Sequence, residues 1–275
     1  MITIKKLGFS YGDHVVLKDI SMNLEEGRIY GLLGENGVGK TTLLTLLAGL
    51  KKVDDGTLEI DGQKPFNREP SFLSNIYYLP DEVPAPRRKA IDFAIDHGQY
   101  WKNFSAQKFS EIMTVFDNDQ NQRMDHMSYG QLKKTFISFA LACNTKYLFM
   151  DEPTNGLDIP SKGQFRKAVS KYTSDDSTLL ISTHQARDLE AIIDPIIILD
   201  RRDVLLNASL DEIAQKLYFD YTSEADPAAL YQEMVPGGNI QVLRNTTGAE
   251  SKVNIEALFN AVLLHKNEIK EMFNK

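Results

Sequence analysis

Segments that alternate like strands, or are apolar throughout, are separated along the chain by segments with the spacing of amphipathic helices. Strands are predicted at residues 2–10, 19–27, 27–34, 56–62, 75–80, 146–153, 177–184, 195–200, 203–207 and 238–245. Helices are predicted at residues 41–50, 129–143, 161–172, 185–193, 209–217 and 254–265. A hairpin is expected at 56–62, and another should pair 195–200 with 203–207.

This alternation of strands and helices is typical of an α/β fold. A mostly apolar strand such as GRIYGLLG (27–34) suits burial on both faces of a sheet, and intervening helices supply the crossovers between parallel strands. The sequence therefore predicts a core with a mainly parallel sheet.

Two regions interrupt the alternation and suggest how the chain is divided. A proline-rich start followed by helical patterns predicts a helical subdomain at about residues 82–143, within a domain spanning 1–210. From 211 to 275 the pattern loosens, which predicts a small α+β appendage. Its first helix should begin with a capping box formed by Ser209 and Glu212.

Composition narrows the function classes. The 275 residues are 42% hydrophobic, enough for a sizeable core, and the net charge of −7 argues against broad nucleic-acid binding. The single cysteine, Cys143, excludes an internal disulfide framework and is expected to pack as a small hydrophobe. No apolar stretch approaches the roughly 18 residues that span a bilayer, so a role at a membrane would need spans from another chain.

The segment GENGVGKT, residues 34–41, matches the phosphate-binding pattern G-x-x-x-x-G-K-[ST] between a predicted strand and a predicted helix. Glycines let backbone N–H groups wrap a phosphate, and the helix N-terminus adds a positive dipole. Lys40 would reach the outer phosphates and Thr41 would hold Mg²⁺. A Gly-rich structural turn is the alternative, which this context disfavours. The predicted binding residues are Gly34, Glu35, Asn36, Gly37, Val38, Gly39, Lys40, Thr41 and Thr42.

The segment YLFMDEP, residues 147–153, ends a buried strand with two acids. Asp151 could bind Mg²⁺ or its waters, and Glu152 could polarise an attacking water as a general base. Such an ending can also be incidental, but a phosphate-binding loop upstream favours a functional role.

The segment HMSYGQLKK, residues 126–134, places Ser128 and Gln131 at the start of a predicted helix. These residues could form only a capping box, or they could also hold a phosphate with the free N–H groups. Spacing does not separate the two interpretations, since both use the same geometry.

The order of these segments resembles that of the ATP-binding cassette (ABC) ATPases, over residues 1–210. The resemblance implies a P-loop NTPase fold of the ABC type, with an antiparallel β-subdomain beside the parallel core. It also implies ATP and Mg²⁺ as ligands. Two cassettes would pair head to tail, so that Ser128, Gly130 and Gln131 hold the nucleotide bound by a second cassette.

Other positions fit the pattern of the same family. Tyr11 lies where the family stacks an aromatic ring on adenine, although it could also be an ordinary core or surface tyrosine. Asp158 closes the NGLD segment, which falls at the family's D-loop between two nucleotide sites. His184 falls at the switch histidine that touches the γ-phosphate. The catalytic set implied by the resemblance is therefore Glu152, His184 and Lys40.

Two positions depart from the family pattern. Tyr129 replaces the first glycine of the Leu-Ser-Gly-Gly-Gln signature, so we expect that this position does not need a positive φ and that Gly130 carries the close approach. Asp81 stands where a glutamine should follow the strand at 75–80; it is expected near the metal with Thr41 and Asp151, where it would add negative charge.

The function implied is that of an ATP-hydrolysing subunit of a transporter, with separate transmembrane permease subunits and a second cassette. The short helical insert and the appended C-terminal region favour an exporter-type cassette, held at the cytoplasmic face of the membrane by the permease. A soluble ABC ATPase acting on nucleic acid or ribosomes, and a regulatory ABC ATPase without transport, are the alternatives. No nucleic-acid partner is expected, given the acidic charge.

Overall fold

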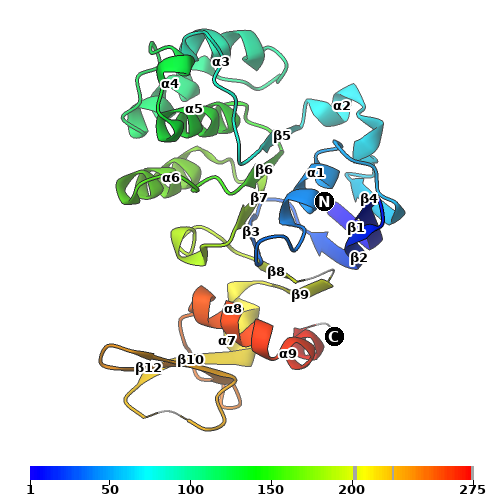
Figure 1. Cartoon of the computed structure of the whole chain (residues 1–275), viewed down its shortest axis with the longest axis vertical. Coiled ribbons are helices and arrows are strands. Elements are labelled where there is room, and N and C mark those ends of the chain that lie inside the picture. Colours follow the sequence, from blue (N-terminus) through cyan, green and yellow to red (C-terminus); the bar gives the residue numbers. More distant parts are fainter. Residues whose placement is uncertain (201–202, 225, 274–275) are drawn as a thin grey trace.

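The computed structural model describes residues 1–200, 203–224 and 226–273, and its centre is a sheet in the order β5-β6-β7-β3-β8-β9 (Figure 1). All neighbours in it are parallel except β8 and β9, which form the predicted hairpin. The strands are β3 Ile29–Leu33, β5 Ile76–Leu79, β6 Tyr147–Asp151, β7 Thr178–Thr183, β8 Ile196–Asp200 and β9 Asp203–Ala208. The expected α/β core with a mainly parallel sheet is confirmed.

A second, antiparallel sheet has the order β2-β1-β4. Its strands are β1 Ile2–Tyr11, β2 His14–Leu24 and β4 Asp55–Ile60. The strand predicted at 56–62 pairs mainly with β1, and its expected hairpin is reduced to one bridge between Ile60 and Gln63. Leu58 and Ile60 are buried with Ile2 and Ile4 of β1, so long-range burial decides this pairing.

Alternate residues of the central strands enter two different hydrophobic clusters, since successive side chains of a strand point to opposite faces. In β8, Ile196 and Ile198 belong to one cluster and Ile197 to the other. Helix α1 and the β2-β1-β4 sheet cover the face of Ile197, whereas α5 and α6 cover the opposite face. These helices are α1 Lys40–Leu47, α5 Tyr129–Ala142 and α6 Ile159–Tyr172.

The helical layer of Figure 1 lies next to β5 and is held together by aromatic side chains. Phe93 and Trp101 both contact Phe139 of α5 edge to face, with ring centroids 5.3 and 5.7 Å apart. The remaining helical elements before α5 are η1 Pro65–Asn67, α2 Pro70–Leu73, α3 Ala90–Gly98, α4 Ala106–Val115 and η2 Met124–His126. Cys143, which follows α5, is buried as expected.

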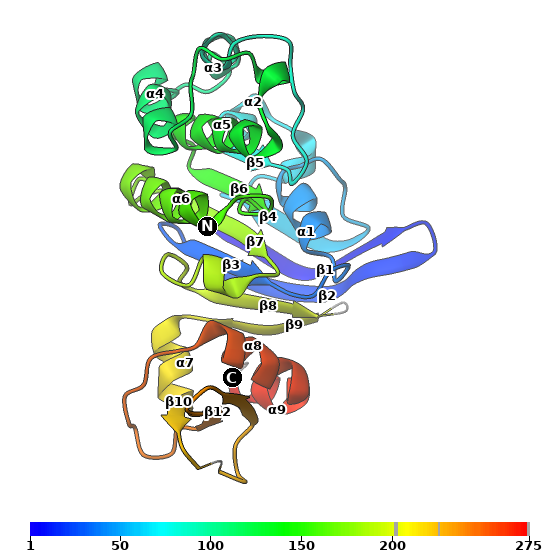
Figure 2. The same cartoon turned by 60° about the vertical axis from the view of Figure 1, so that its left-hand side comes forward.

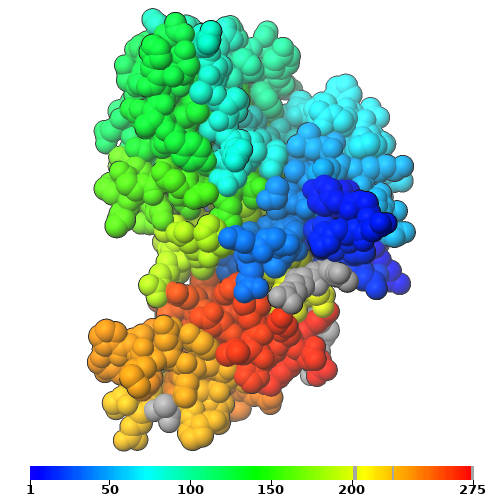
Figure 3. Space-filling model, viewed as in Figure 1, coloured from blue at the N-terminus to red at the C-terminus, as the bar shows by residue number. Residues whose placement is uncertain are grey.

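The C-terminal part lies next to β8 and β9 in Figures 1 and 2, and its orange and red atoms form the lower part of the molecule in Figure 3. Leu258 and Ile269 belong to the same hydrophobic cluster as Leu206 of β9. The predicted capping box of Ser209 and Glu212 is present. The elements of this part are α7 Leu210–Lys216, β10 Leu217–Thr222, β11 Tyr231–Val235, β12 Gly238–Arg244, α8 Ile255–Leu264 and α9 Lys266–Phe273.

The helix predicted at 185–193 is wrong. Only the short 3-10 helix η3 Ala186–Asp188 forms there, followed by turns. The residue before a proline is disfavoured in a helix, and Asp194 precedes Pro195 and instead donates its N–H to the carbonyl of Ile29 at 2.8 Å. The apolar residues of the segment, Leu189 and Ile193, are buried without a helix.

Within residues 1–200, 203–224 and 226–273, no helix combines the length and apolar content that crossing a membrane requires.

Candidate functional site

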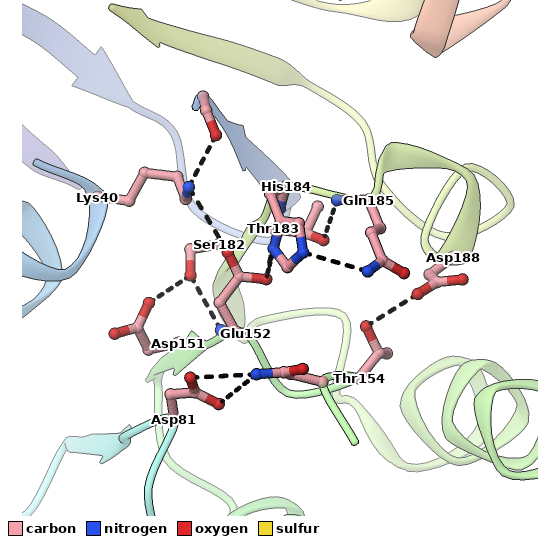
Figure 4. A network of polar contacts seen from close by, with 12 residues as sticks. Lys40, Asp81, Asp151, Glu152, Thr154, Ser182, Thr183, His184, Gln185 and Asp188 are labelled. Carbon is pink, nitrogen blue, oxygen red and sulfur yellow. Dashed lines mark hydrogen bonds and ion pairs between the residues drawn. The ribbon is translucent and has the colours of Figure 1, made fainter. Parts of the chain in front are cut away.

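Three adjacent strands bring the predicted chemical residues to one edge of the central sheet (Figures 2 and 4). Strands β6, β7 and β3 are parallel, so their carboxyl ends meet. Asp151 and Glu152 lie at the end of β6, His184 directly follows β7, and the loop 34–39 joins β3 to α1. Topology thus converts three distant segments into one site.

The loop between β3 and α1 needs its glycines. Gly39 has a φ of 110°, and a Cβ there would stand 2.8 Å from Leu17. At Gly34 a Cβ would stand 2.6 Å from the carbonyl oxygen of Leu199. The loop can therefore follow this path against Leu17 and Leu199 only with glycine at these positions.

Lys40 folds back onto this loop. Its Nζ donates to the carbonyl of Gly34 at 2.7 Å and to that of Glu35 at 3.2 Å. Burial lowers the pKa of Lys40 below its usual value, and the charge of Glu152 opposes that shift. The Lys40 Nζ therefore lies at the mouth of the loop, where an anion could replace its two carbonyl partners.

Asp151 is 2% exposed and holds two hydroxyl groups. Thr41 Oγ1 donates to its Oδ2 at 2.6 Å, and Ser182 Oγ donates to its Oδ1 at 2.5 Å. A hydroxyl and a carboxylate oxygen side by side are the donors that Mg²⁺ prefers. In the described part of the chain, no group of three or more His, Cys, Asp or Glu could hold a metal ion alone, so phosphate oxygens or waters would complete the coordination of any metal here.

Glu152 lies between the side chains of Lys40 and His184 (Figure 4). Its Oε1 is 3.5 Å from Lys40 Nζ, and its Oε2 is 2.9 Å from His184 Nδ1. The backbone at Glu152 has a φ of 45°, a conformation that costs a non-glycine residue about 1–2 kcal/mol. Ser182 Oγ accepts the Glu152 N–H at 3.0 Å and stabilises this turn.

Tyr11 stands beside the first turn of the helix that follows the loop. It ends β1, its side chain is 48% exposed, and its hydroxyl is 3.4 Å from Thr42 Oγ1. Lys51 Nζ lies over the ring, 4.7 Å from its centroid. An exposed ring held next to the phosphate-binding loop could stack on a planar base.

Ser128 begins α5 with the complete capping box. Its Oγ accepts the Gln131 N–H at 3.3 Å, and Gln131 Oε1 accepts the Ser128 N–H at 2.9 Å. Tyr129 is the first residue of the helix, so the expectation that this position needs no positive φ is confirmed. At Gly130 a Cβ would stand 3.6 Å from Gly156 O, so no close approach within this chain requires that glycine.

Asp158 caps α6 by accepting the Ser161 N–H at 2.9 Å. Hydrogen bonding from the Ser161 side chain, together with this backbone bond, lowers the pKa of Asp158. The Asp158 carboxylate therefore has a structural role as the N-cap of α6, whether or not residues 155–158 also contact a ligand.

Asp81 has partners that the sequence did not reveal. Its carboxylate is 3.2 Å from Lys133 Nζ and 3.3 Å from Asn155 Nδ2. Lys133 could not be distinguished from its neighbour Lys134 by sequence. Ser182 was also missed, although a serine inside the apolar strand LLIST was a usable signal.

Residues 17–155 match the family described as ABC transporter. The chain is 28% identical to the ABC transporter ATP-binding protein YtrB of Bacillus subtilis, over 78% of this chain and 74% of YtrB. It is 27% identical to the lantibiotic transport ATP-binding protein SrtF of Streptococcus pyogenes, over 77% of this chain and 92% of SrtF.

Solved structures agree on the fold. An ATP-binding subunit of an ABC transporter aligns with a TM-score of 0.70 at 22% identity, covering 78% of this chain and 91% of that one. A dimeric bacterial ABC transporter cassette aligns with a TM-score of 0.67 at 22% identity, covering 76% of this chain and 99% of that one.

Proposed function

Because this chain belongs to the ABC transporter family and is an ATPase, we propose that it is the nucleotide-binding subunit of an ABC transporter and works as one half of a cassette dimer. Separate transmembrane subunits would hold it at the cytoplasmic face of a membrane. Residues 1–210 form the cassette in this proposal, with the helical subdomain at 82–143, and residues 211–275 form the appendage.

The proposal of a cassette dimer rests on one observation. The loop that precedes α1 and the Ser128 cap of α5 belong to helices on opposite faces of the same sheet. Each is suited to an anion, because each offers free N–H groups at a helix start. A second copy, placed head to tail, would bring Ser128, Gly130 and Gln131 to the outer phosphate held by Lys40.

Hydrolysis follows from the residues around Glu152. Its carboxylate accepts a proton from the attacking water, while Lys40 and His184 stand on either side and offset the charge that develops on the γ-phosphate. Lys40 exchanges the carbonyls of Gly34 and Glu35 for phosphate oxygens. The positive φ of Glu152 fixes the direction of its side chain before the substrate arrives.

Thr41 and Asp151 would hold Mg²⁺ together with the phosphates, which suits the 2.6 Å contact between their oxygens. The ion would supply charge neutralisation at the phosphates. Ser182 would keep the Asp151 carboxylate oriented, since it donates to Oδ1 and leaves Oδ2 to the Thr41 side.

Tyr11 would stack on the adenine, since its exposed ring stands beside Thr42 at the end of α1 that bears the loop. Asp158, the last residue of the segment 155–158, would lie between the two nucleotide sites.

The permease would dock in an apolar groove of about 760 Å³ between α2, β5 and the end of α3. Leu50 and Tyr100 are 51% and 69% exposed and line this groove together with other apolar residues, so a partner could cover a contiguous apolar surface there. The small helical subdomain and the short appendage favour an exporter.

Affinity purification from detergent-solubilised membranes tests this proposal. The tagged chain should bring down a protein with several apolar spans, identified by mass spectrometry, and Leu50→Glu with Tyr100→Glu should abolish that recovery. Tyr221→Glu, at a 57% exposed tyrosine of the appendage, is the matched control. Recovery of ribosomes or nucleic acid in place of a membrane protein would contradict the transporter function.

A further inference from the structure

The two residues that depart from the family pattern contact each other. The Tyr129 hydroxyl donates a hydrogen bond to the carbonyl oxygen of Asp81 at 3.0 Å. They lie 48 positions apart in sequence, one at the start of α5 and the other after β5. The tyrosine and the acid are therefore parts of one arrangement.

A buried cation completes this arrangement. The Lys133 side chain is fully buried, and its Nζ lies 3.2 Å from Asp81 Oδ1 and also donates to the Asp81 carbonyl. Burial lowers the pKa of Lys133, and the Asp81 carboxylate opposes that shift. A buried ammonium needs a carboxylate, because an unpaired charge in the interior is strongly destabilising.

The loop after Glu152 joins the same cluster. Asn155 Nδ2 lies 3.3 Å from both carboxylate oxygens of Asp81. Gly156, with a φ of 76°, fits against the Tyr129 ring so closely that a Cβ would stand 2.6 Å from it. Three separate segments thus meet around Asp81: the β5 loop, the start of α5 and the loop 155–158.

We infer that Asp81 is a positioning residue and not a magnesium ligand: with Lys133 and Tyr129 it fixes the start of α5 against the loop 155–158. The inference rests on the proposed function, in which Ser128 and the residues around Glu152 act on nucleotide. It replaces the expectation that this acid, standing at a glutamine position, contacts the metal.

The partners of the two acids separate the roles. Asp151 accepts from the hydroxyls of Thr41 and Ser182, which are neutral and compatible with a cation. Asp81 is paired with an ammonium, so a divalent cation on the same carboxylate would be repelled by Lys133. The charge that Asp81 adds near the site is already neutralised within the chain.

The connection has a mechanical consequence. Ser128 is immediately before Tyr129, and Asn155 is three residues after Glu152. Fastening Tyr129 and Asn155 to Asp81 therefore ties the half-site built by Ser128 to the loop that follows the general base. Substitutions that break these contacts should displace Ser128 and the loop after Glu152 and so lower kcat, while Thr41 and Asp151 stay in place.

The test compares wild type with Asp81→Asn, Lys133→Met and the double variant, with Glu82→Gln as the matched control at the next, exposed acid. Denaturant unfolding without nucleotide measures the coupling between the two positions. Hydrogen exchange at the amides of Asn155 and Leu157 reports on the order of the loop, since these amides donate to the carbonyls of Glu152 and Thr154. The Mg²⁺ concentration that gives half-maximal ATPase activity reports on metal binding at the site.

Asp81→Asn should be the least stable protein, because Lys133 stays buried without its carboxylate, and the double variant should recover stability relative to it. Amide exchange at 155 and 157 should be faster in Asp81→Asn, and kcat should fall about tenfold or more, with partial recovery in the double variant. The Mg²⁺ dependence should stay within about twofold of wild type throughout, because no metal ligand has changed.

A rise of about tenfold or more in the half-maximal Mg²⁺ concentration for Asp81→Asn, unrelieved by Lys133→Met, would overturn the inference and make Asp81 a metal-shell residue. The inference would also be overturned if the loss of unfolding free energy in the double variant equalled the sum of the losses in Asp81→Asn and Lys133→Met. If Asp81→Asn does not fold, Tyr129→Phe removes only the hydroxyl: faster exchange at 155 and 157 with an unchanged Mg²⁺ dependence supports the inference, and unchanged exchange contradicts it. A wild type without ATPase activity would refute the proposed function alone, since coupling and exchange need no nucleotide.

Discussion

The Glu152 carboxylate contacts the His184 imidazole directly, with Oε2 2.9 Å from Nδ1. The same oxygen accepts the His184 backbone N–H at 3.3 Å, so the end of β7 holds the side chain at two points. The other carboxylate oxygen faces Lys40. A base held between Lys40 and His184 in this way is oriented before any substrate binds.

Glu152→Gln should therefore separate binding from hydrolysis. The amide keeps the shape and the hydrogen-bonding capacity of the side chain but cannot take a proton from water, so phosphate release should fall about 10²- to 10⁴-fold. Nucleotide binding should persist, and the protein should accumulate as an ATP-bound dimer in light scattering. Glu250→Gln, at an exposed acid of the appendage, is the control. Turnover near the wild-type rate in Glu152→Gln would remove the base from the mechanism.

Ser128→Ala distinguishes a helix cap from a phosphate site. As a cap alone, Ser128 contributes about 1 kcal/mol, and ATPase per folded molecule would be unchanged. As half of a composite site it should be essential, and mixing Ser128→Ala with Lys40→Ala should restore activity, since one of the two sites in a mixed dimer is then intact.

The rate of phosphate release should also rise faster than linearly with protein concentration when the protein is dilute, because a monomer lacks a complete site. A specific activity independent of concentration, combined with an unimpaired Ser128→Ala protein, would leave the residue as a cap and exclude the head-to-tail dimer.

Ile269→Ala tests whether the appendage and the cassette share one core. Ile269 is fully buried in the cluster that also contains Leu206 of β9, so its truncation should lower the free energy of unfolding by about 2–5 kcal/mol within a single transition. Leu264→Ala, at a neighbouring leucine that is 67% exposed, should change it by less than about 0.5 kcal/mol. Two resolved transitions would show that residues 211–275 unfold separately.

Asp61→Asn should reduce stability in a pH-dependent way. Burial alone would raise the pKa of Asp61, but hydrogen bonds from Lys146 at 2.8 Å, from the Met1 amino group at 2.6 Å and from Tyr147 at 2.8 Å lower it below its usual value. A lowered carboxyl pKa stabilises the fold above the unfolded pKa, and that stability is lost as the pH falls through the folded pKa.

The variant should therefore be about 0.2–1 kcal/mol less stable than wild type at pH 7, a small value because the side chain is partly exposed and screened. The difference should shrink toward strongly acidic pH. Urea unfolding at several pH values measures it, with Asp13→Asn, exposed in the turn between β1 and β2, as the control. A deficit that does not change with pH would assign the effect to packing.

The sequence by itself determined the features that depend only on residues close together in the chain. The glycines of the loop 34–39, the apolar strand that ends in Asp151 and Glu152, and the capping box of Ser128 each need only neighbouring residues, and each was found where the pattern placed it. The α/β class followed from periodicity, since strands buried on both faces need crossover helices. The family's order of motifs then supplied the expected site.

Tertiary structure decided every relationship that spans the chain. Nothing near Asp81 indicates that Lys133 would neutralise it, because ion pairing depends on which elements meet and not on spacing. The apolar residues at 185–193 looked helical, but the chain has to turn into β8 there and buries them without a helix. The placement of α1 and α5 on opposite faces of the sheet was equally absent from local pattern, because crossover and packing choose the face on which each helix lies.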